Sequence, residues 1–211
     1  MRKLQILMVL VFLCAASGCS PRDFLTRRLA ADLIAGSDVF KSNQEFWLHT
    51  GIISNKDYFS PEYLVLQRRG WITGANAPCA AAAGPNTIPG NRTAAPSDCW
   101  DVVLTPLGVG AFSDLIPSDA RASQSFSVSV ARRELVKVAG ISKNGNVADI
   151  DFLWKWVPLN EVGAALYAEG VQYHATVSFK HYDDGWRVIE GSAPKTNQGL
   201  DDALKNAEPV Q

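Results

Sequence analysis

Few side chains in this sequence have the types and spacing that a reaction needs. Asp149 and Asp151 are two residues apart in an alternating segment, so their carboxylates share one face of a predicted strand. Paired carboxylates can act as acid and base or hold a calcium ion. Lys155 lies on the same polar face. We therefore favour a solvated face over an acid–base pair.

The three histidines do not suggest a metal site. His174 and His181 are seven residues apart on one predicted strand, so they face opposite ways, and His49 is remote from both. The sequence also lacks the motifs of serine hydrolases, zinc proteases, nucleotide-binding loops and redox cysteine pairs. We expect no catalytic residue, metal or cofactor, and the sequence gives no positive case for an enzyme.

Residues 1–18 have the layout of a secretory signal peptide. The positive segment Met1-Arg2-Lys3 precedes an apolar run from Leu4 to Cys14, and small residues follow at 15–18. The apolar run is shorter than the roughly 20 residues that a membrane-spanning helix needs. We expect this segment to direct export and then to be removed.

The motif Ala16-Ser17-Gly18-Cys19 resembles the lipobox of bacterial lipoproteins. In that family the cysteine sulfur receives a diacylglyceryl group, the signal is cleaved, and the new amino group is usually acylated. The first motif position is most often Leu in the family and is Ala16 here. The resemblance implies lipidation at Cys19, which would tether the mature chain to a membrane. Ser20 replaces the Asp that favours inner-membrane retention, which implies the periplasmic side of the outer membrane in a Gram-negative host.

Cys79 and Cys99 would remain as an even pair after Cys14 is cleaved off and Cys19 is lipidated. The segment between them, AAAAGPNTIPGNRTAAPSD, is rich in small and turn-forming residues and predicts a surface loop. An oxidising compartment favours a disulfide between its ends. In the chain-entropy model, closing a loop of about twenty residues stabilises a fold by roughly 3 kcal/mol. A metal pair is the weaker alternative because no histidine or second cysteine pair lies nearby.

The N-terminal part of the mature chain predicts helices and one hairpin. Helical spacing, with proline near the start and glycine at the end, marks residues 20–36 and 61–69, whereas 45–53 is ambiguous between helix and strand. Residues 71–73 and 100–104 predict two strands of a hairpin whose long tip contains the cysteine loop. This order loosely resembles a winged-helix unit. We interpret the unit as scaffold, because an exported chain meets no DNA.

The C-terminal half predicts a curved antiparallel sheet with one helix, in the order ββαββ. Asn144-Gly145 is a strong hairpin signal between its first two strands. The architecture resembles the cystatin-like and nuclear-transport-factor-like α+β folds, although no residue motif carries the likeness. The predicted elements are strands at 126–138 and 147–157, a helix after Asn160, and strands at 171–180 and 186–189.

The predicted fold class is therefore α+β, with an N-terminal helical part and a C-terminal sheet. Composition is that of an ordinary globular chain, with 47% hydrophobic and 19% charged residues. Loss of Arg2 and Lys3 with the signal changes the formal net charge from −1 to −3, which argues against nucleic-acid binding. The expected divisions are a signal peptide at 1–18, a helix-rich subdomain with the disulfide loop at 19–118, a sheet subdomain at 119–192 and a polar tail at 193–211.

Five aromatic residues of the predicted sheet form a candidate ligand pocket. Aromatic side chains on a curved sheet either line an apolar pocket or fill the core. Our main expectation is a lipid-anchored cell-envelope protein with a non-catalytic binding or structural role, whose partner is an envelope protein or a small ligand. The alternatives are a small-ligand carrier that uses this pocket and an envelope hydrolase without a recognisable motif. The pocket residues are Trp154, Trp156, Tyr173, Phe179 and Trp186.

We predict that Cys19→Ser abolishes incorporation of labelled palmitate and leaves the precursor unprocessed, because the lipid is attached to the sulfur of this residue. Metabolic labelling followed by gel analysis measures both effects. Cys14→Ser, which leaves the Cys19 sulfur in place, is the matched control and is expected to be labelled normally. Normal labelling of Cys19→Ser would refute the assignment.

Overall fold

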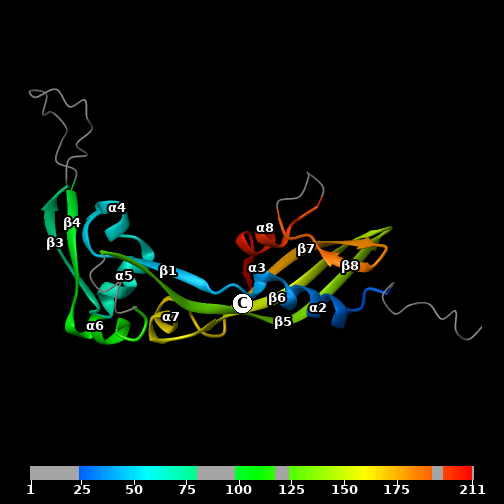
Figure 1. The fold of residues 1–211 in the computed structure, drawn as a ribbon, viewed down its shortest axis with the longest axis horizontal. Coiled ribbons are helices and arrows are strands. Elements are labelled where there is room, and N and C mark those ends of the chain that lie inside the picture. The colour runs from blue at the N-terminus through cyan, green and yellow to red at the C-terminus, as the bar shows by residue number, and fades with distance from the viewer. Residues whose placement is uncertain (1–23, 80–97, 117–123, 192–196, 211) are drawn as a thin grey trace, which may run out of the picture. The chain divides into compact units, whose positions relative to one another are not determined.

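The computed structural model describes residues 24–79, 98–116, 124–191 and 197–210 (Figure 1). Of the described residues, 29% are helical and 47% are in strands, with a curled antiparallel sheet, which is a mixed class compatible with α+β. The signal peptide and Cys19 lie outside the described residues. No helix in the described ranges is long and apolar enough to cross a membrane.

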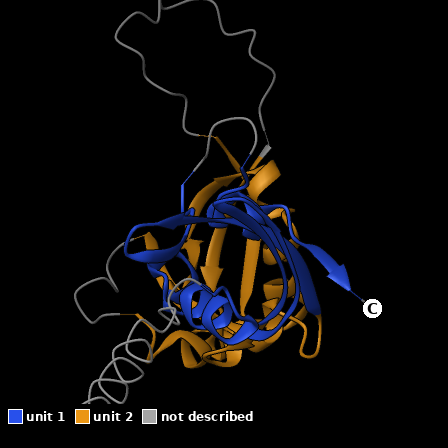
Figure 2. Cartoon of the chain, turned by 90° about the vertical axis from the view of Figure 1, so that its right-hand side faces the viewer, with its two compact units in different colours: residues 1–41, 135–155, 172–211 blue, residues 42–134, 156–171 orange. Residues whose placement is uncertain are grey.

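The chain folds into two compact units, each assembled from segments that are distant in sequence (Figure 2). Unit 1 comprises Met1–Lys41, Leu135–Lys155 and Gln172–Gln211, and unit 2 comprises Ser42–Glu134 and Trp156–Val171. These two units do not coincide with the contiguous subdomains 19–118 and 119–192 that the sequence predicts. The reason is that two long strands, β5 (Ser125–Asn144) and β6 (Val147–Pro158), each contribute residues to both units.

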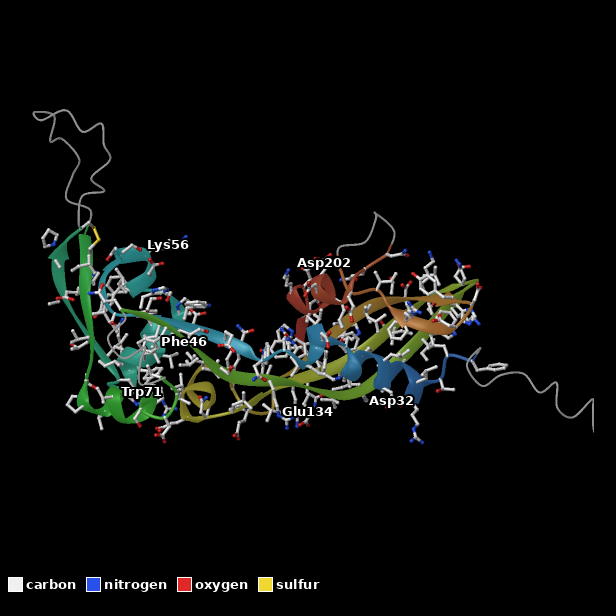
Figure 3. The ribbon with its side chains drawn as sticks, viewed as in Figure 1. Asp32, Phe46, Lys56, Trp71, Glu134 and Asp202 are labelled. Carbon is white, nitrogen blue, oxygen red and sulfur yellow. A yellow bond between two sulfur atoms is a disulfide. The ribbon has the colours of Figure 1, made fainter. Side chains whose placement is uncertain are left out.

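In unit 2, three antiparallel strands form a small sheet in the order β2 (Gly51–Ser54), β4 (Asp98–Leu104) and β3 (Ile72–Pro78). The predicted hairpin is confirmed, since Ile72 lies opposite Leu104. A disulfide joins Cys79 to Cys99, with their Cα atoms 5.0 Å apart, at the ends of β3 and β4. The bond is drawn in yellow in Figure 3.

The ambiguous segment 45–53 proves to be two strands, β1 (Gln44–His49) and β2, in different sheets. Between them, Gly51 has φ +77°, which is accessible to glycine at little cost. β1 pairs antiparallel with the first residues of β5, so that Phe46 lies opposite Val128. The change of sheet within a few residues explains why no single periodicity is visible in the sequence.

Four helices complete the described part of unit 2. The predicted helix at 61–69 is α5 (Pro61–Arg68), and Gly70 at φ +70° follows it. α4 (Asn55–Tyr58) and α6 (Pro106–Phe112) are short, as is α7 (Glu161–Leu166). Asn160 begins α7 as predicted, because its Oδ1 accepts a hydrogen bond from the Gly163 N–H at 2.9 Å.

These elements enclose one hydrophobic core, to which Phe46 and Trp71, labelled in Figure 3, both belong. Burying large apolar side chains contributes about 25 cal/mol per Å² removed from water, so such a core stabilises unit 2 more than its short helices do. The buried members are Phe46, Leu48, Ile53, Tyr58, Tyr63, Leu66, Trp71, Ile72, Val102, Phe112, Ile116, Phe126, Val128, Val130 and Val162.

In unit 1, β5 and β6 continue into a sheet with β7 (Gln172–Tyr182), β8 (Gly185–Val188) and β9 (Glu208–Val210). Along the described chain these elements follow one another as β5, β6, α7, β7 and β8. The first turn falls one residue later than predicted, on Gly145 and Asn146, with Gly145 at φ +61°. Alternation along β6 buries Ala148, Ile150, Phe152 and Trp154.

The sequence predicts one helix together with the sheet, and the structure corrects which helices contact the strands of unit 1. The inserted helix α7 contacts α5 and α6 within unit 2. The helices that contact the strands of unit 1 come from the two ends of the described chain. α2 (Arg27–Gly36) contacts β8, α8 (Leu200–Lys205) contacts β7, and α3 (Asp38–Lys41) contacts α8. The residues 20–23 of the predicted first helix lie outside the described ranges.

The segment expected to be a polar tail, with one turn of helix near residues 201–206, forms α8 and β9 over residues 200–210. Leu200, Ala203 and Leu204 are buried, at the i, i+3 and i+4 spacing that one helical face provides. β9 then pairs with β7, with Tyr173 opposite Pro209. Both β8 and β9 use the edge of β7 that β6 leaves open, and α8 connects them.

We predict opposite effects of two Gly→Ala substitutions in α6. A Cβ on Gly108 would lie 1.9 Å from the Trp71 carbonyl oxygen, whereas one on Gly110 would meet nothing within 4 Å. Gly108→Ala should lower the free energy of unfolding by about 1–3 kcal/mol through overpacking. Gly110→Ala should raise it by about 0.5–1 kcal/mol through helix propensity. Urea unfolding of both variants measures the difference, and equal midpoints would contradict the packing described.

Candidate functional site

A groove of about 680 Å³ lies in unit 2 beside β1. One wall is β1 itself, the other comes from β2, α4 and the start of α5, and Gln124, Ser125 and Tyr167 complete the lining. Its floor is apolar, since Phe46 and Tyr63 are buried with ring centroids 6.3 Å apart. A concave surface with an apolar floor and polar walls is the usual form of a binding site.

β1 is an edge strand within the described part of the chain. It pairs with β5 along one edge, and no described strand pairs with its other edge. Alternation along β1 buries Phe46 and Leu48, while the Trp47 side chain is 59% exposed. An open edge presents main-chain N–H and C=O groups that seek hydrogen-bond partners. The groove therefore contains main-chain groups as well as side chains.

Tyr63 covers this open edge at one residue. Its hydroxyl accepts a hydrogen bond from the His49 N–H at 2.7 Å and donates one to the His49 carbonyl oxygen at 2.9 Å. The main-chain groups of His49 thus point away from β5, and by the alternation of an antiparallel strand those of Trp47 do so too. Among the described residues, none forms a hydrogen bond with the main chain of Trp47 at this edge.

Burial raises the pKa of the Tyr63 phenol above its ordinary value of 10.0. The hydrogen bond from the His49 N–H opposes this rise in pKa, and the negative charge of Asp57 adds to it. The phenol is therefore protonated at neutral pH and can donate to the His49 carbonyl oxygen. One neutral hydroxyl satisfies both polar groups of an edge residue that would otherwise need water.

Three acidic side chains line the groove. Glu45, Asp57 and Glu62 line it, and none of its described lining residues is a lysine or arginine. Ser127 donates a hydrogen bond to Glu45 at 2.7 Å, and Ser129 donates a second one. Asp57 accepts a hydrogen bond from Ser54 at 2.7 Å. Three carboxylates on a partly enclosed surface favour a cationic ligand.

Ser54 and His49, the serine and histidine nearest to a hydrolase pair in the groove, have other partners. The Ser54 hydroxyl donates to a carboxylate, while the His49 ring stacks on the Trp47 ring at 6.5 Å with a 16° interplanar angle. A hydrolase of the serine type needs its histidine hydrogen-bonded to the nucleophile. The described contacts of the groove contain no such pair.

No family model matches the chain, and neither a curated protein nor a solved structure does. The role of this groove therefore has to be inferred from its own residues. The lipobox resemblance concerns residues 16–19 and does not extend to the groove.

The candidate aromatic pocket of the sequence analysis is only partly assembled in unit 1. Trp154 and Tyr173 lie opposite each other on β6 and β7, with rings stacked at 4.8 Å. Phe179 is fully buried farther along β7, and Trp186 is buried on β8 with its ring 5.0 Å from that of His181. The cavities described in the structure are lined by other residues.

Trp156, the fifth residue of that set, belongs to unit 2. Its ring lies 5.1 Å from that of Tyr167, and the Arg133 guanidinium lies 4.8 Å from its centroid. A cation placed over a tryptophan ring is attracted by the ring quadrupole. The structure thus distributes the five aromatic residues among separate contacts, and a ligand pocket formed by them stays a prediction.

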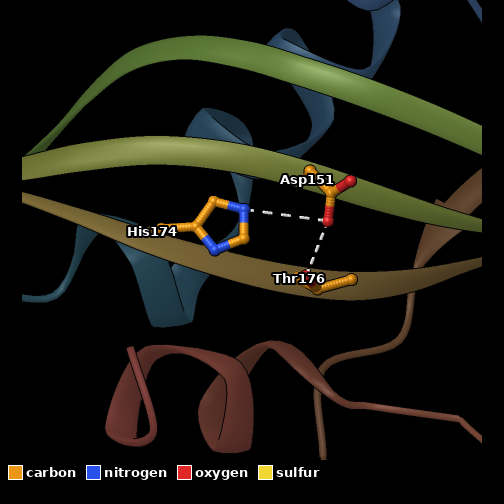
Figure 4. A network of polar contacts seen from close by, with 3 residues as sticks. All are labelled: Asp151, His174 and Thr176. Atoms are coloured by element: carbon orange, nitrogen blue, oxygen red, sulfur yellow. Dashed lines mark hydrogen bonds and ion pairs between the residues drawn. The ribbon is translucent and has the colours of Figure 1, made fainter. Parts of the chain in front are cut away.

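The carboxylates of Asp149 and Asp151 form hydrogen bonds across to β7. Asp149 accepts from Ser178, and Asp151 accepts from Thr176, both at 2.7 Å. The Nε2 atom of His174 lies 3.8 Å from the same Asp151 oxygen (Figure 4). Within the described ranges, no group of three His, Cys, Asp or Glu residues is placed to hold a metal ion.

The sequence analysis missed the groove, although one signal for it was present. In the stretch EFWLH, Phe46 and Leu48 alternate with Glu45, Trp47 and His49. Reading that alternation as a half-buried strand would have placed a tryptophan on the solvent face. Tyr63 gave no such signal, because its contact with His49 depends on how α5 packs against β1.

We predict that Tyr63→Phe lowers the free energy of unfolding by about 1–3 kcal/mol at neutral pH, because both polar groups of His49 lose their partner. Tyr58→Phe is the matched control, since Tyr58 is also buried in unit 2 and its hydroxyl forms no hydrogen bond with described residues. Urea unfolding at neutral pH measures both.

The raised pKa of Tyr63 also gives a pH dependence. Its contribution to stability is fully present below the unfolded value of 10.0 and is lost as the pH rises through the folded value. Between neutral pH and pH values above 10, wild type should therefore lose stability more steeply than Tyr63→Phe. If the free energies of unfolding of the two proteins changed in parallel with pH, burial would not raise the pKa of Tyr63 in the folded state.

Proposed function

We propose that this protein is a lipid-anchored cell-envelope protein whose body binds a partner without converting it chemically. The anchor is proposed from the lipobox-like motif Ala16-Ser17-Gly18-Cys19, which follows a segment with the layout of a signal peptide. Two or three acyl chains would hold the chain firmly, because each buried methylene contributes about 0.8 kcal/mol. In a Gram-negative host, Ser20 favours the periplasmic side of the outer membrane.

The observation that carries the binding role is the groove beside β1. It combines an apolar floor, three carboxylates and an open strand edge at Trp47. Exposing a tryptophan by 59% in the wall of a groove costs hydrophobic free energy that a partner would recover on contact. A binding role accounts for these features together, which is the reason that we propose it.

We predict that a photoreactive phenylalanine analogue at Trp47 forms covalent adducts in intact cells that make the lipidated chain. The control position is Leu107 on α6, whose side chain is 68% exposed outside the groove. Adducts should form at position 47 and be several-fold weaker at 107. Gel shift and mass spectrometry of the adducts measure this. Equal adducts at the two positions, or none at 47, would contradict a partner in the groove.

A further inference from the structure

We propose that the groove binds a cationic peptide segment in an extended conformation, which adds as a strand to the open edge of β1. The inference rests on the binding role proposed above and is independent of the lipid anchor. It specifies the chemistry of the partner: a main chain that pairs with Trp47, and lysine or arginine side chains that face the carboxylates of the groove.

The open edge has definite limits. On one side, the Tyr63 hydroxyl occupies both polar groups of His49. On the other side, the register of β1 shifts between Gln44 and Glu45, and the Glu45 carbonyl oxygen accepts a hydrogen bond from the Gln44 side chain at 3.1 Å. Trp47 lies between these limits with its N–H and C=O directed outward. A paired residue of a peptide would exchange both hydrogen bonds with it, as in an ordinary antiparallel ladder.

Charge complementarity selects a cationic peptide. Glu45, Asp57 and Glu62 line the groove without a described lysine or arginine among them. In an extended peptide, side chains two residues apart project from the same face at a spacing of about 6.6–6.8 Å. Basic residues at alternate positions would therefore all face one wall. The exposed ring of Trp47 adds a surface over which a cation or an aliphatic stem can pack.

The outward N–H and C=O groups of Trp47 distinguish a peptide from other candidate ligands. A polyamine would satisfy the carboxylates and leave the N–H and C=O of Trp47 unpaired. An oligosaccharide would stack on the Trp47 ring and donate hydroxyl hydrogen bonds to the carboxylates, but it carries no positive charge that neutralises them. Only a peptide backbone supplies a donor and an acceptor at the spacing that an edge strand presents. We therefore favour strand addition, and the other two ligands become controls.

The experiment uses the full mature chain in detergent micelles and isothermal titration calorimetry. The probe is an acetylated hexapeptide amide of alternating valine and lysine. The control ligands are the same hexapeptide with alternate amides N-methylated, its valine–glutamate counterpart, spermidine and a hexamer of N-acetylglucosamine. The lysine peptide should bind, and N-methylation should weaken binding at least about tenfold because it removes the ladder hydrogen bonds.

Matched variants test the charge pairs and the main-chain hydrogen bonds separately. Glu62→Gln should weaken binding about two- to fivefold, as expected for one exposed charge pair. Glu161→Gln should leave it unchanged, since Glu161 is also an exposed glutamate in the first turn of a helix in unit 2 but does not line the groove. Trp47→Pro removes the edge N–H at a position where proline is tolerated, whereas Trp47→Phe keeps that N–H. Only the proline variant should abolish binding.

Hydrogen exchange gives an independent readout, because pairing should protect the Trp47 amide from exchange and leave that of Leu48, already paired with β5, unchanged. Equal binding of the N-methylated peptide would overturn strand addition. Binding of the sugar or the glutamate peptide in place of the lysine peptide would overturn the cationic assignment. If none of the ligands binds while adducts still form at position 47 in cells, the peptide chemistry is wrong and the binding role stands. Absence of those adducts would reject the binding role itself.

Discussion

Main-chain pairing along β5 is the interaction on which both units depend. This strand runs from Ser125 to Asn144, and its first residues pair with β1 in unit 2. Its residues from Leu135 onward belong to unit 1, and β6 is its neighbour in the sheet. Every hydrogen bond of such a ladder fixes register, and register decides which side chains reach the core. The exposed position of Trp47 follows from the same rule, because Phe46 and Leu48 take the buried positions on β1.

Neighbouring side chains cover part of the open edge of β1 and leave the rest open. Unpaired edges invite association with other chains, and proteins usually cover or charge them. Here Tyr63 covers His49 through its hydroxyl, and acidic side chains surround the residue that stays open. The unpaired stretch of β1 is short, so a partner forms few main-chain hydrogen bonds with it. The remaining binding free energy has to come from charge pairs. Such an arrangement suits a reversible contact whose strength falls with ionic strength.

Local signals in the sequence predicted much of the fold. Pro61 and Gly70 bounded α5, Asn160 began α7, and alternation marked β6 and β7. What escaped prediction depends on contacts between distant segments. β1 and β2 enter different sheets, α7 contacts α5 and α6, and three buried apolar residues hold α8 against unit 1. The groove escaped for the same reason: its acidic and aromatic side chains come from β1, α4 and α5, and no periodicity links them.

The covalent bond between Cys79 and Cys99 closes residues 80–98 into a ring attached to the ends of β3 and β4. A protease that cuts once inside this ring cannot separate the two fragments. The nicked chain gains only the water of hydrolysis and stays one molecule until the sulfurs are reduced, and both halves of the β3–β4 ladder remain at high effective concentration. The disulfide thus keeps the ends of β3 and β4 together even when one peptide bond between the two cysteines is cut.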